Sequence, residues 1–351
     1  MTAPEEDRMA DAEQVVNVGI IGTGGMGRRH AHNLHRKVKG VEVAGVSDVD
    51  EVRMAQVATE CSGACTFKDP YELISDERID AVLIVSPDDT HADFVLACLE
   101  QRKPVLCEKP LATSSKEAQR IIDAETAIGR RLVAVGFMRR FDPCHVAVKE
   151  ALELGALGRP VLFRGVHRNA GAQPGLPRHL IVGGSAIHDI DSARWLLQQE
   201  VVEVFGRGLR VDPALDEDFY DLLLIQLLLS GDCLGTIEVF VSARYGYEVM
   251  AEIVGSGGTA TTTQPAPAML RRLQQRSTSV HGDWLERFQE AYVLELEQWI
   301  QSLRGGRFQG ASAWDGYISL LVARACVTSL ESGRPETVQA PPPPQLYREE
   351  L

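Results

Sequence analysis

The chain lacks the features that membrane, secreted and nucleic-acid-binding proteins need. None of its apolar runs approaches the ~20 residues required to span a bilayer, and its acidic, polar start is unlike a secretory signal. Positive charge is scarce, with 36 Lys and Arg against 49 Asp and Glu and a net charge of −13. Binding to phosphates or to an anionic membrane needs clustered cations. We therefore expect a cytoplasmic protein that contacts neither nucleic acid nor membrane.

Cysteine is sparse as well. The seven cysteines are scattered and odd in number, and no Cys-x-x-Cys occurs. Several stand in apolar surroundings, which indicates core thiols and not disulfides. Cys61 and Cys65 have no second pair of Cys or His nearby, so zinc is not expected, and neither is any other metal.

The first half of the chain alternates aliphatic runs with amphipathic segments. This pattern is typical of a parallel sheet covered on both faces, and such sheets bind ligands beyond the carboxyl ends of their strands. We predict a Rossmann domain of the α/β class. The expected strands are Val16–Ile21, Val41–Ser47, Asp80–Ser86, Pro104–Cys107 and Leu132–Phe137, and the expected helices are Met26–Lys37, Glu51–Cys61, Thr90–Gln101 and Ser114–Ile128.

A glycine loop, Gly22-Thr23-Gly24-Gly25-Met26-Gly27, follows the first of these strands and opens the first helix. Alone, such a loop can be a tight turn without a ligand. Here an acid, Asp48, stands at the next strand end, about twenty residues further on. Glycines let a pyrophosphate approach the backbone at the helix N-terminus. Because Asp48 can accept hydrogen bonds from ribose hydroxyls and has no arginine beside it in the sequence, we expect NAD and not NADP.

The second half has a different pattern, in which long alternating runs are joined by short polar turns. This favours an α+β domain with a large, mainly antiparallel open sheet. Near its C-terminal end the chain has four consecutive prolines, which predict an extended, polyproline-like arm or linker. The expected strands are Val161–Arg168, Val201–Leu209, Tyr220–Leu229, Leu234–Val241, Tyr247–Val254 and Thr259–Thr263, and the expected helices are Cys144–Leu154, Gly183–Gln199, Asp283–Leu303 and Ser312–Ser332.

Length and pattern together predict two domains with a tail at each end. We expect a disordered tail over residues 1–14 and a Rossmann NAD-binding domain over residues 15–138. A domain for substrate binding and oligomerisation is expected over residues 139–335, and a proline-rich tail over residues 336–351.

The order and spacing of several motifs resemble the Gfo/Idh/MocA family of oxidoreductases, which includes inositol, glucose and related sugar dehydrogenases. The resemblance runs from about Val16 to Gly333 and is strongest to the bacterial myo-inositol 2-dehydrogenase branch. It rests on the glycine loop and on Ser86-Pro87-Asp88-Asp89-Thr90-His91, Glu108-Lys109-Pro110, Gly136-Phe137-Met138-Arg139-Arg140-Phe141-Asp142-Pro143, His167-Arg168-Asn169 and His188-Asp189-Ile190-Asp191.

The resemblance implies that Lys109 lies beside the nicotinamide and takes part in moving the proton of the substrate hydroxyl. Such a base must come within about 3 Å of the hydroxyl. Taken alone, Lys109 would be a surface lysine at a strand end. The cofactor-binding residues that we expect are Gly22, Gly24, Gly25, Met26, Gly27, Asp48, Ser86, Pro87, His91, Glu108 and Lys109.

His188 is the second catalytic residue that the resemblance implies, as an acceptor or relay of the same proton. A lone histidine on an apolar helix is otherwise a core residue. Asp191 shares its helix face and either orients the imidazole or pairs with a cation. The expected substrate-binding residues are Lys109, Met138, His167, Asn169, Gly184, His188 and Tyr247, with Arg139 as a further candidate.

The chain departs from the inositol dehydrogenases just before His188. Those enzymes carry an aspartate four residues before the histidine, where this chain has Gly184 beside Gly183. Glycine has no side chain that could bind a hydroxyl or relay a proton, and its small size leaves space. A bulkier substrate, such as an aminocyclitol or a sugar unit of an aminoglycoside-type glycoside, would suit that space. The alternative is a degraded site.

Three functions therefore stay open at this stage. The first is an NAD-dependent dehydrogenase of a cyclitol or sugar, which the presence of Lys109 and His188 favours. The second is a non-catalytic relative that senses a ligand, and the third is an NADP-dependent reductase of a keto-sugar. The large sheet and the habit of the family imply a homotetramer or homodimer.

Overall fold

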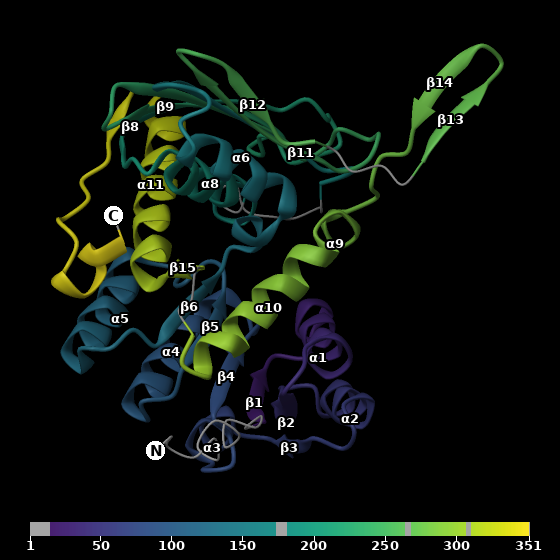
Figure 1. Cartoon of the computed structure of the whole chain (residues 1–351), viewed down its shortest axis with the longest axis vertical. Coiled ribbons are helices and arrows are strands. Elements are labelled where there is room, and N and C mark those ends of the chain that lie inside the picture. Colours follow the sequence, from purple (N-terminus) through teal and green to yellow (C-terminus); the bar gives the residue numbers. More distant parts are fainter. Residues whose placement is uncertain (1–14, 173–180, 264–267, 307–309, 351) are drawn as a thin grey trace, which may run out of the picture. The chain divides into compact units, whose positions relative to one another are not determined.

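The computed structural model describes residues 15–172, 181–263, 268–306 and 310–350, and the chain forms two compact units (Figure 1). The first unit holds the chain up to Thr113 together with Gln119–Gly136 and Tyr292–Ala313, and the second holds the remainder. The chain thus returns to the first unit late, which the sequence pattern did not indicate. The tail expected over residues 1–14 lies outside the described residues.

The first unit is built on a seven-stranded sheet of order β15-β6-β5-β4-β1-β2-β3. All neighbouring pairs are parallel except β15 with β6. Every residue of β4 and β6 is buried, as expected when helices cover both faces. The strands are β1 (Val16–Ile21), β2 (Val41–Ser47), β3 (Cys65–Phe67), β4 (Ala81–Ile84), β5 (Val105–Glu108), β6 (Val133–Gly136) and β15 (Ala311–Ser312).

The helices of this unit cover the sheet, and their starts follow local sequence signals. Asp50 caps α2 by accepting from Val52 N and Arg53 N, and Asp69 caps α3, which has Pro70 in its first turn. The late segment joins the core because Trp299 and its α10 neighbours pack into it. The helices are α1 (Gly25–Lys37), α2 (Glu51–Glu60), α3 (Pro70–Ser75), the 3-10 turn η2 (Asp88–Thr90), α4 (His91–Glu100), α5 (Ser115–Ile128) and α10 (Gln289–Leu303).

The second unit contains a seven-stranded sheet of order β12-β11-β7-β10-β9-β8-β16. Only β7 and β10 are parallel; the other pairs are antiparallel. The predicted large, mainly antiparallel sheet is confirmed. The strands are β7 (Pro160–Arg168), β8 (Val201–Leu209), β9 (Leu222–Leu229), β10 (Cys233–Phe240), β11 (Glu248–Gly255), β12 (Thr259–Thr261) and β16 (Glu336–Thr337), beside a separate hairpin of β13 (Met269–Arg272) and β14 (Gln275–Thr278).

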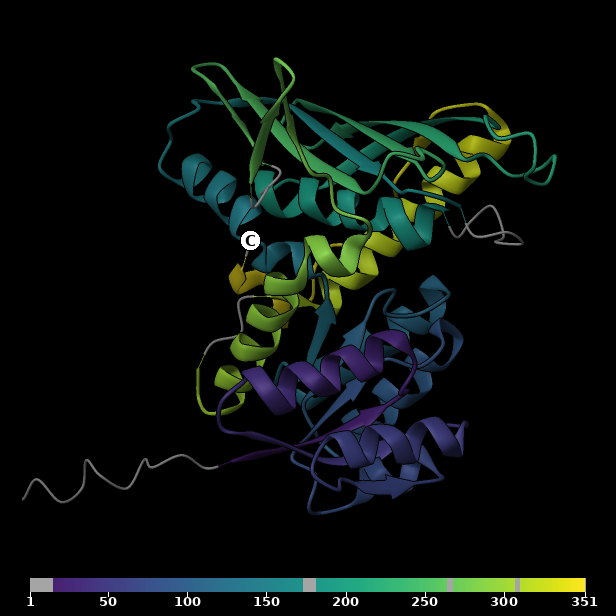
Figure 2. The same ribbon diagram turned by 90° about the vertical axis from the view of Figure 1, so that its right-hand side faces the viewer.

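Helices cover one face of this second sheet (Figures 1 and 2). In β9 every second residue is buried, which is the expected pattern for a sheet packed on one side. Exposed leucines, among them Leu224 and Leu234, mark the other face. The helices of the unit are η3 (Met138–Phe141), α6 (Pro143–Glu153), the π-helix η4 (Val182–Ala186), α8 (Ile187–Leu197), α9 (Trp284–Arg287), α11 (Ala313–Ser332) and η5 (Gln345–Glu350).

Two predicted helices are divided in the structure. The helix expected over Gly183–Gln199 begins as the π-helix η4, where two glycines weaken the α-helical ladder, and ends at Gln198 in the left-handed region. The helix expected over Asp283–Leu303 breaks at Phe288 between α9 and α10. The β13–β14 hairpin was not predicted, because its residues are exposed on both faces and show no alternation.

The proline-rich end of the chain is not a free arm. Glu336 and Thr337 add an antiparallel strand to β8, and Val338 is buried. Beyond the prolines, Tyr347 is 3% exposed and stacks on Trp314 of α11 with ring centroids 5.9 Å apart. Burial of this aromatic ring holds the segment against the unit.

Two further expectations concern cysteines and membrane spans. All seven cysteines are free and five are buried, so the prediction of core thiols is confirmed. Across the described ranges, no helix has both the length and the apolar character needed to cross a bilayer.

Candidate functional site

The glycine loop between β1 and α1 lies in close contact with the backbone of neighbouring segments. Gly22 has a φ of +92°, and a Cβ there would lie 2.5 Å from the carbonyl oxygen of Val85. A Cβ on Gly27 would lie 1.9 Å from the carbonyl oxygen of Gly22, so only glycine lets α1 start this close to the strand. In the described part of the chain, no atom lies within 4 Å of a Cβ built on Gly24 or Gly25. A ligand can therefore reach the backbone of the loop at those two residues.

The start of α1 supplies the donors that an anionic group needs. At Gly24, no side chain in the described part of the chain caps the helix. The first N–H groups and the positive end of the helix dipole therefore favour a phosphate at this point. The geometry of the loop thus fits the pyrophosphate of a dinucleotide, and the contacts of its residues with a cofactor stay predictions.

Asp48 follows β2, and its carboxylate is surrounded by donors from the protein. Thr23 donates from N and Oγ1 to Oδ2 at 2.6 and 2.8 Å. Arg53 Nη2 and Asp50 N donate to Oδ1 at 2.6 and 2.9 Å. Burial opposes ionisation, but hydrogen bonds from Arg53, Asp50 and Thr23 lower the pKa of Asp48 to about 2.

Arg53 corrects one expectation from the sequence, which placed no arginine beside Asp48. The start of α2 brings it there, because Asp50 caps the helix and Arg53 lies in its first turn. A ribose hydroxyl would have to share the Asp48 carboxylate with Arg53. The ribose contact of Asp48 stays a prediction.

His91 lies at the start of α4, close to two strand ends. Its Nδ1 is 2.7 Å from the carbonyl oxygen of Pro110 and its Nε2 is 2.9 Å from that of Ser86. The ring is 1% exposed, so His91 ties the segments that follow β4 and β5 together. Ser86 Oγ bonds Thr90 Oγ1 at 2.6 Å, and Pro87 is exposed. Direct cofactor contacts of these residues stay predictions.

Lys109 directly follows β5, whose carboxyl end lies at the same edge of the parallel sheet as the glycine loop after β1. It is half-buried, and its bond to Pro110 is cis. The neighbouring Glu108 accepts the Lys109 N–H at Oε2 (3.2 Å), while Oε1 lies 2.8 Å from His30 Nε2. Burial opposes ionisation, but His30 and Lys109 lower the pKa of Glu108. A side-chain bridge to α1 thus fixes the strand end that carries Lys109.

His188 belongs to the second unit, near the start of α8. It is 7% exposed, and its ring packs edge-on against Phe137 with centroids 5.9 Å apart. Its carbonyl oxygen accepts from Ser192 Oγ at 2.7 Å. The structure thus places His188 next to the start of the Met138–Phe141 turn, and its catalytic role stays a prediction.

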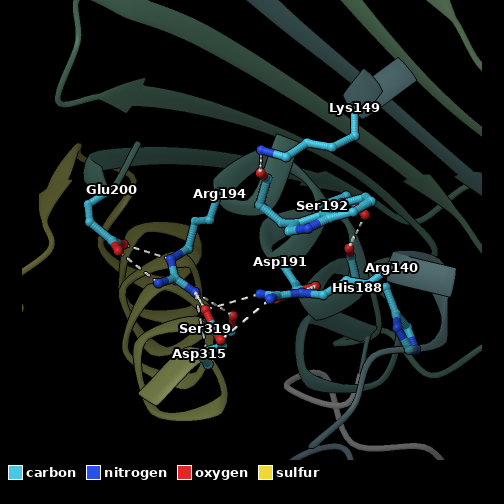
Figure 3. A network of polar contacts seen from close by, with 10 residues as sticks. Arg140, Lys149, His188, Asp191, Ser192, Arg194, Glu200, Asp315 and Ser319 are labelled. Carbon is cyan, nitrogen blue, oxygen red and sulfur yellow. Dashed lines mark hydrogen bonds and ion pairs between the residues drawn. The ribbon is translucent and has the colours of Figure 1, made fainter. Parts of the chain in front are cut away.

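Asp191 pairs with Arg140 (Figure 3). Arg140 Nε and Nη2 donate to Oδ2 and Oδ1 at 3.0 and 2.6 Å, and Arg140 also pairs with Asp315 of α11 at 3.0 Å. Arg194 extends the network to Glu200 at 2.6 Å. Of the two readings of Asp191, the structure agrees with the ion-pair partner and not with the residue that orients the imidazole.

Around His167, the structure assembles a buried polar cluster that the sequence indicated only in part. Asp189 Oδ1 accepts from Arg139 Nη1 at 2.7 Å, and Oδ2 lies 3.2 Å from His167 Nδ1. Tyr247 packs edge-on against His167, with its hydroxyl 3.5 Å from Nε2. His167, Tyr247 and the candidate Arg139 therefore do lie together.

Asp189 holds this cluster in place and was missed as a site residue. Burial opposes its ionisation, but Arg139 and His167 lower the pKa of Asp189. One feature could have pointed to Asp189: it is an acid on a helix whose residues are nearly all buried. A buried carboxylate requires a partner.

Met138 and Asn169, two other residues predicted to bind substrate, differ in the polar groups that they offer. Met138 is 2% exposed in η3. Asn169, the residue after β7, has a buried Oδ1 that accepts no hydrogen bond from any described residue. That oxygen could accept from a hydroxyl or amine of a ligand.

Gly184 lies within the π-helix η4, and its contact with a substrate stays a prediction. Among the described residues, no atom outside the backbone of this helix lies within 4 Å of a Cβ built on Gly183 or Gly184. A π-helical turn shifts the register of side chains by one residue, but both candidate positions are glycine, so neither register supplies an acid. Among the described residues, no group of three or more His, Cys, Asp or Glu could hold a metal ion.

Two family models match the chain. One, described as an oxidoreductase family with an NAD-binding Rossmann fold, matches residues 16–137. The other, described as the C-terminal alpha/beta domain of the oxidoreductase family, matches residues 149–339.

Individual proteins match over nearly the whole chain. The inositol 2-dehydrogenase of Rubrobacter xylanophilus is 50% identical over 342 residues, which cover 97% of this chain and 98% of that protein. Inositol 2-dehydrogenase 2 of Saccharopolyspora erythraea is 44% identical over 332 residues, covering 95% and 98%. The crystal structure of myo-inositol dehydrogenase from Lactobacillus casei with NAD(H) and myo-inositol aligns with a TM-score of 0.91 at 33% identity, covering 95% and 99%.

These matches agree with the glycine loop, the two sheets and the motifs described above. The chain belongs to the Gfo/Idh/MocA family, and it is an NAD-dependent oxidoreductase of CH–OH groups that resembles the inositol 2-dehydrogenases.

Proposed function

We propose that the chain oxidises a secondary hydroxyl of a cyclitol or sugar to a ketone. The observation that carries this proposal is the place of Lys109, which directly follows β5 at the sheet edge where the glycine loop fits a dinucleotide. The names of its relatives support an inositol-like polyol.

Bound NAD supplies the hydride acceptor for such an oxidation. Lys109 Nζ takes the hydroxyl proton as the carbon–hydrogen bond breaks, and His188 serves as an acceptor or relay of the same proton. Glu108 orients the strand end by accepting the Lys109 N–H at 3.2 Å. In the second unit, His167, Tyr247 and Asn169 Oδ1 provide donors and acceptors for further ring hydroxyls.

We further propose that the substrate carries a group larger than a hydroxyl, as in an aminocyclitol or the sugar unit of an aminoglycoside-type glycoside. This proposal rests on the surroundings of Gly183 and Gly184, where a built Cβ meets no atom of the described residues within 4 Å. A glycine four residues before His188, where the resemblance to inositol dehydrogenases implies an aspartate, suits a substituent and not a bare hydroxyl.

A substrate panel tests the proposal. The purified chain is assayed for reduced nicotinamide with NAD and with NADP against inositols, aminocyclitols, aldoses and aminoglycosides. We expect turnover with NAD and a cyclitol or sugar, highest for a substituted one. Clear NAD binding without turnover of any of these compounds would contradict the proposal and favour a ligand sensor.

Restoring the acid tests the role of the open space. Because no described residue lies within 4 Å of a Cβ at this position, we expect Gly184→Asp to fold and to raise the preference for myo-inositol over a bulkier substrate by about tenfold, or ~1.4 kcal/mol. The measurement is the ratio of kcat/KM values for the two substrates. Gly184→Asn, which fills the same space without an anion, is the matched control, and unchanged ratios in both variants would argue against the role.

The exposed face of the second sheet supports a homotetramer or homodimer. The side chains of Leu224, Leu228 and Leu234 are exposed on this face. The sheet also carries exposed ion pairs, such as Arg164 with Glu252 at 2.8 Å. An apolar face without a covering helix is typical of an interface with another subunit.

A further inference from the structure

Glu295 of α10 is a buried carboxyl group that the proposed reaction does not use. It is 0% exposed, and within the described part of the chain neither of its oxygens has a hydrogen-bond partner. An ionised carboxylate in such a place would be strongly unfavourable, so the neutral acid is the stable form. Burial, reinforced by the negative charge of Glu108, raises the pKa of Glu295 well above its usual value. A neutral acid has one O–H to donate.

His30 of α1 offers the acceptor that this donor lacks. Its Nε2 lies 2.8 Å from Glu108 Oε1, and because an ionised Glu108 only accepts, Nε2 carries the proton. In a neutral imidazole Nδ1 must then be an acceptor, and Nδ1 is buried without a partner among the described residues. The His30 ring packs edge-on against Tyr292, with centroids 5.6 Å apart. Tyr292 and Glu295 are three residues apart on α10 and share one helix face.

We propose that Glu295 is a positioning residue, a neutral acid linked to His30 Nδ1 through one bridging water, with the acid donating to the water and the water donating to Nδ1. This link holds the His30 ring in the form that donates from Nε2 to Glu108. Glu108 in turn accepts the backbone N–H of Lys109 at 3.2 Å. This series of hydrogen bonds therefore runs from Glu295 to Lys109. The consequence for catalysis rests on the proposed role of Lys109, but the hydrogen bond itself does not.

The state of His30 is tested first, in the unaltered protein. Nitrogen-15 NMR of the histidine rings distinguishes a neutral ring protonated at Nε2, a neutral ring protonated at Nδ1 and an imidazolium, and His30→Gln assigns the signal. We expect the neutral ring protonated at Nε2. Both an imidazolium and a neutral ring protonated at Nδ1 carry a hydrogen on Nδ1, so neither leaves an acceptor for the acid. Either result overturns the proposal, whatever the activity.

Variants of Glu295 then test the effect on Lys109. Glu295→Gln keeps a donor and should retain most of the rate and the pH profile of kcat/KM. Glu295→Leu keeps the volume but has no donor, so we expect kcat to fall by about tenfold or more, with a shifted pH profile and little change in KM. Glu290→Leu, on the exposed start of the same helix, is the matched control.

The two variants separate positioning from a purely structural role. If Glu295→Leu keeps the parental pH profile, or if Glu295→Gln loses as much activity as Glu295→Leu, the positioning role is wrong. Should Glu295→Leu fail to fold, the comparison of Glu295→Gln with the parent protein and the NMR result still decide. Failure of the proposed function would appear differently, as a Lys109 variant that remains active.

Discussion

Replacement of Lys109 by alanine should lower kcat/KM by about 10²- to 10⁴-fold, which is the range for loss of a general base. Lys109 directly follows β5 at the sheet edge that carries the dinucleotide loop. Lys68 follows the outermost strand β3 at the same edge, but it is exposed and pairs with Glu51 at 2.7 Å. NAD affinity, measured by fluorescence titration, should stay within several-fold, because we expect the pyrophosphate to bind at the start of α1. The expected result is therefore a protein that binds NAD and hardly turns over.

Two further variants sharpen this experiment. Lys109→Arg keeps the positive charge but cannot give up its proton, so it should be nearly as inactive as Lys109→Ala. Lys116→Ala removes an exposed lysine in the first turn of α5 and should leave the rate unchanged. Near-parental turnover in Lys109→Ala would remove Lys109 from the proton transfer.

Replacement of Asp142 by alanine should destabilise the second unit by about 3–5 kcal/mol, the usual cost of removing one partner of a buried ion pair. Asp142 accepts from Arg287 at 2.8 and 3.0 Å and lies 2.5 Å from His145 Nδ1. The side chains of Arg287 and His145 are 1% and 0% exposed. Without the carboxylate, the Arg287 charge remains buried and unpaired. Urea denaturation at neutral pH measures the loss.

The acid dependence of stability offers an independent check on Asp142. Burial opposes its ionisation, but His145 and Arg287 lower the pKa of Asp142 from its ordinary 3.8 to about 2. A lowered pKa means that the contribution is complete above the ordinary value and is lost as pH falls through about 2. Asp142→Ala should therefore lose less stability than the parent protein over this acid range. Asp212→Ala, which breaks an exposed pair with Arg244, should leave the unfolding midpoint nearly unchanged.

Local patterns in the sequence were sufficient for the framework of the fold. Strands such as Val16–Ile21, Val41–Ser47 and Val201–Leu209 have the predicted bounds, because aliphatic runs bounded by turn residues form strands wherever they lie. The glycine loop was equally readable from its motif, although only Gly27 is required by a contact close in the sequence, with Gly22, and Gly22 itself approaches Val85 on the segment after β4. Motif order was enough to indicate the family.

Contacts between distant segments were not readable in the same way. Whether Asp191 faces His188 or Arg140 depends on how the turn over Met138–Phe141 packs against α8, and helical spacing allows both. Arg53 reaches Asp48 because a cap at Asp50 sets the start of α2. Tyr347 stacks on Trp314 because the C-terminal segment folds back onto α11. The run of prolines before it does not predict this packing.

The sequence by itself determined the two-sheet architecture, the dinucleotide loop, the family and the candidate residues Lys109 and His188, because each follows from periodicity or from motifs within one segment. Only the tertiary structure decided which buried charges are partners. It assigned Asp191 to Arg140, Asp189 to Arg139 and His167, and Glu108 to His30, and it left Glu295 buried near Glu108 without a partner among the described residues. The physical reason is that the energy of a buried charge depends on its neighbours in space, and these come from segments far apart in the chain.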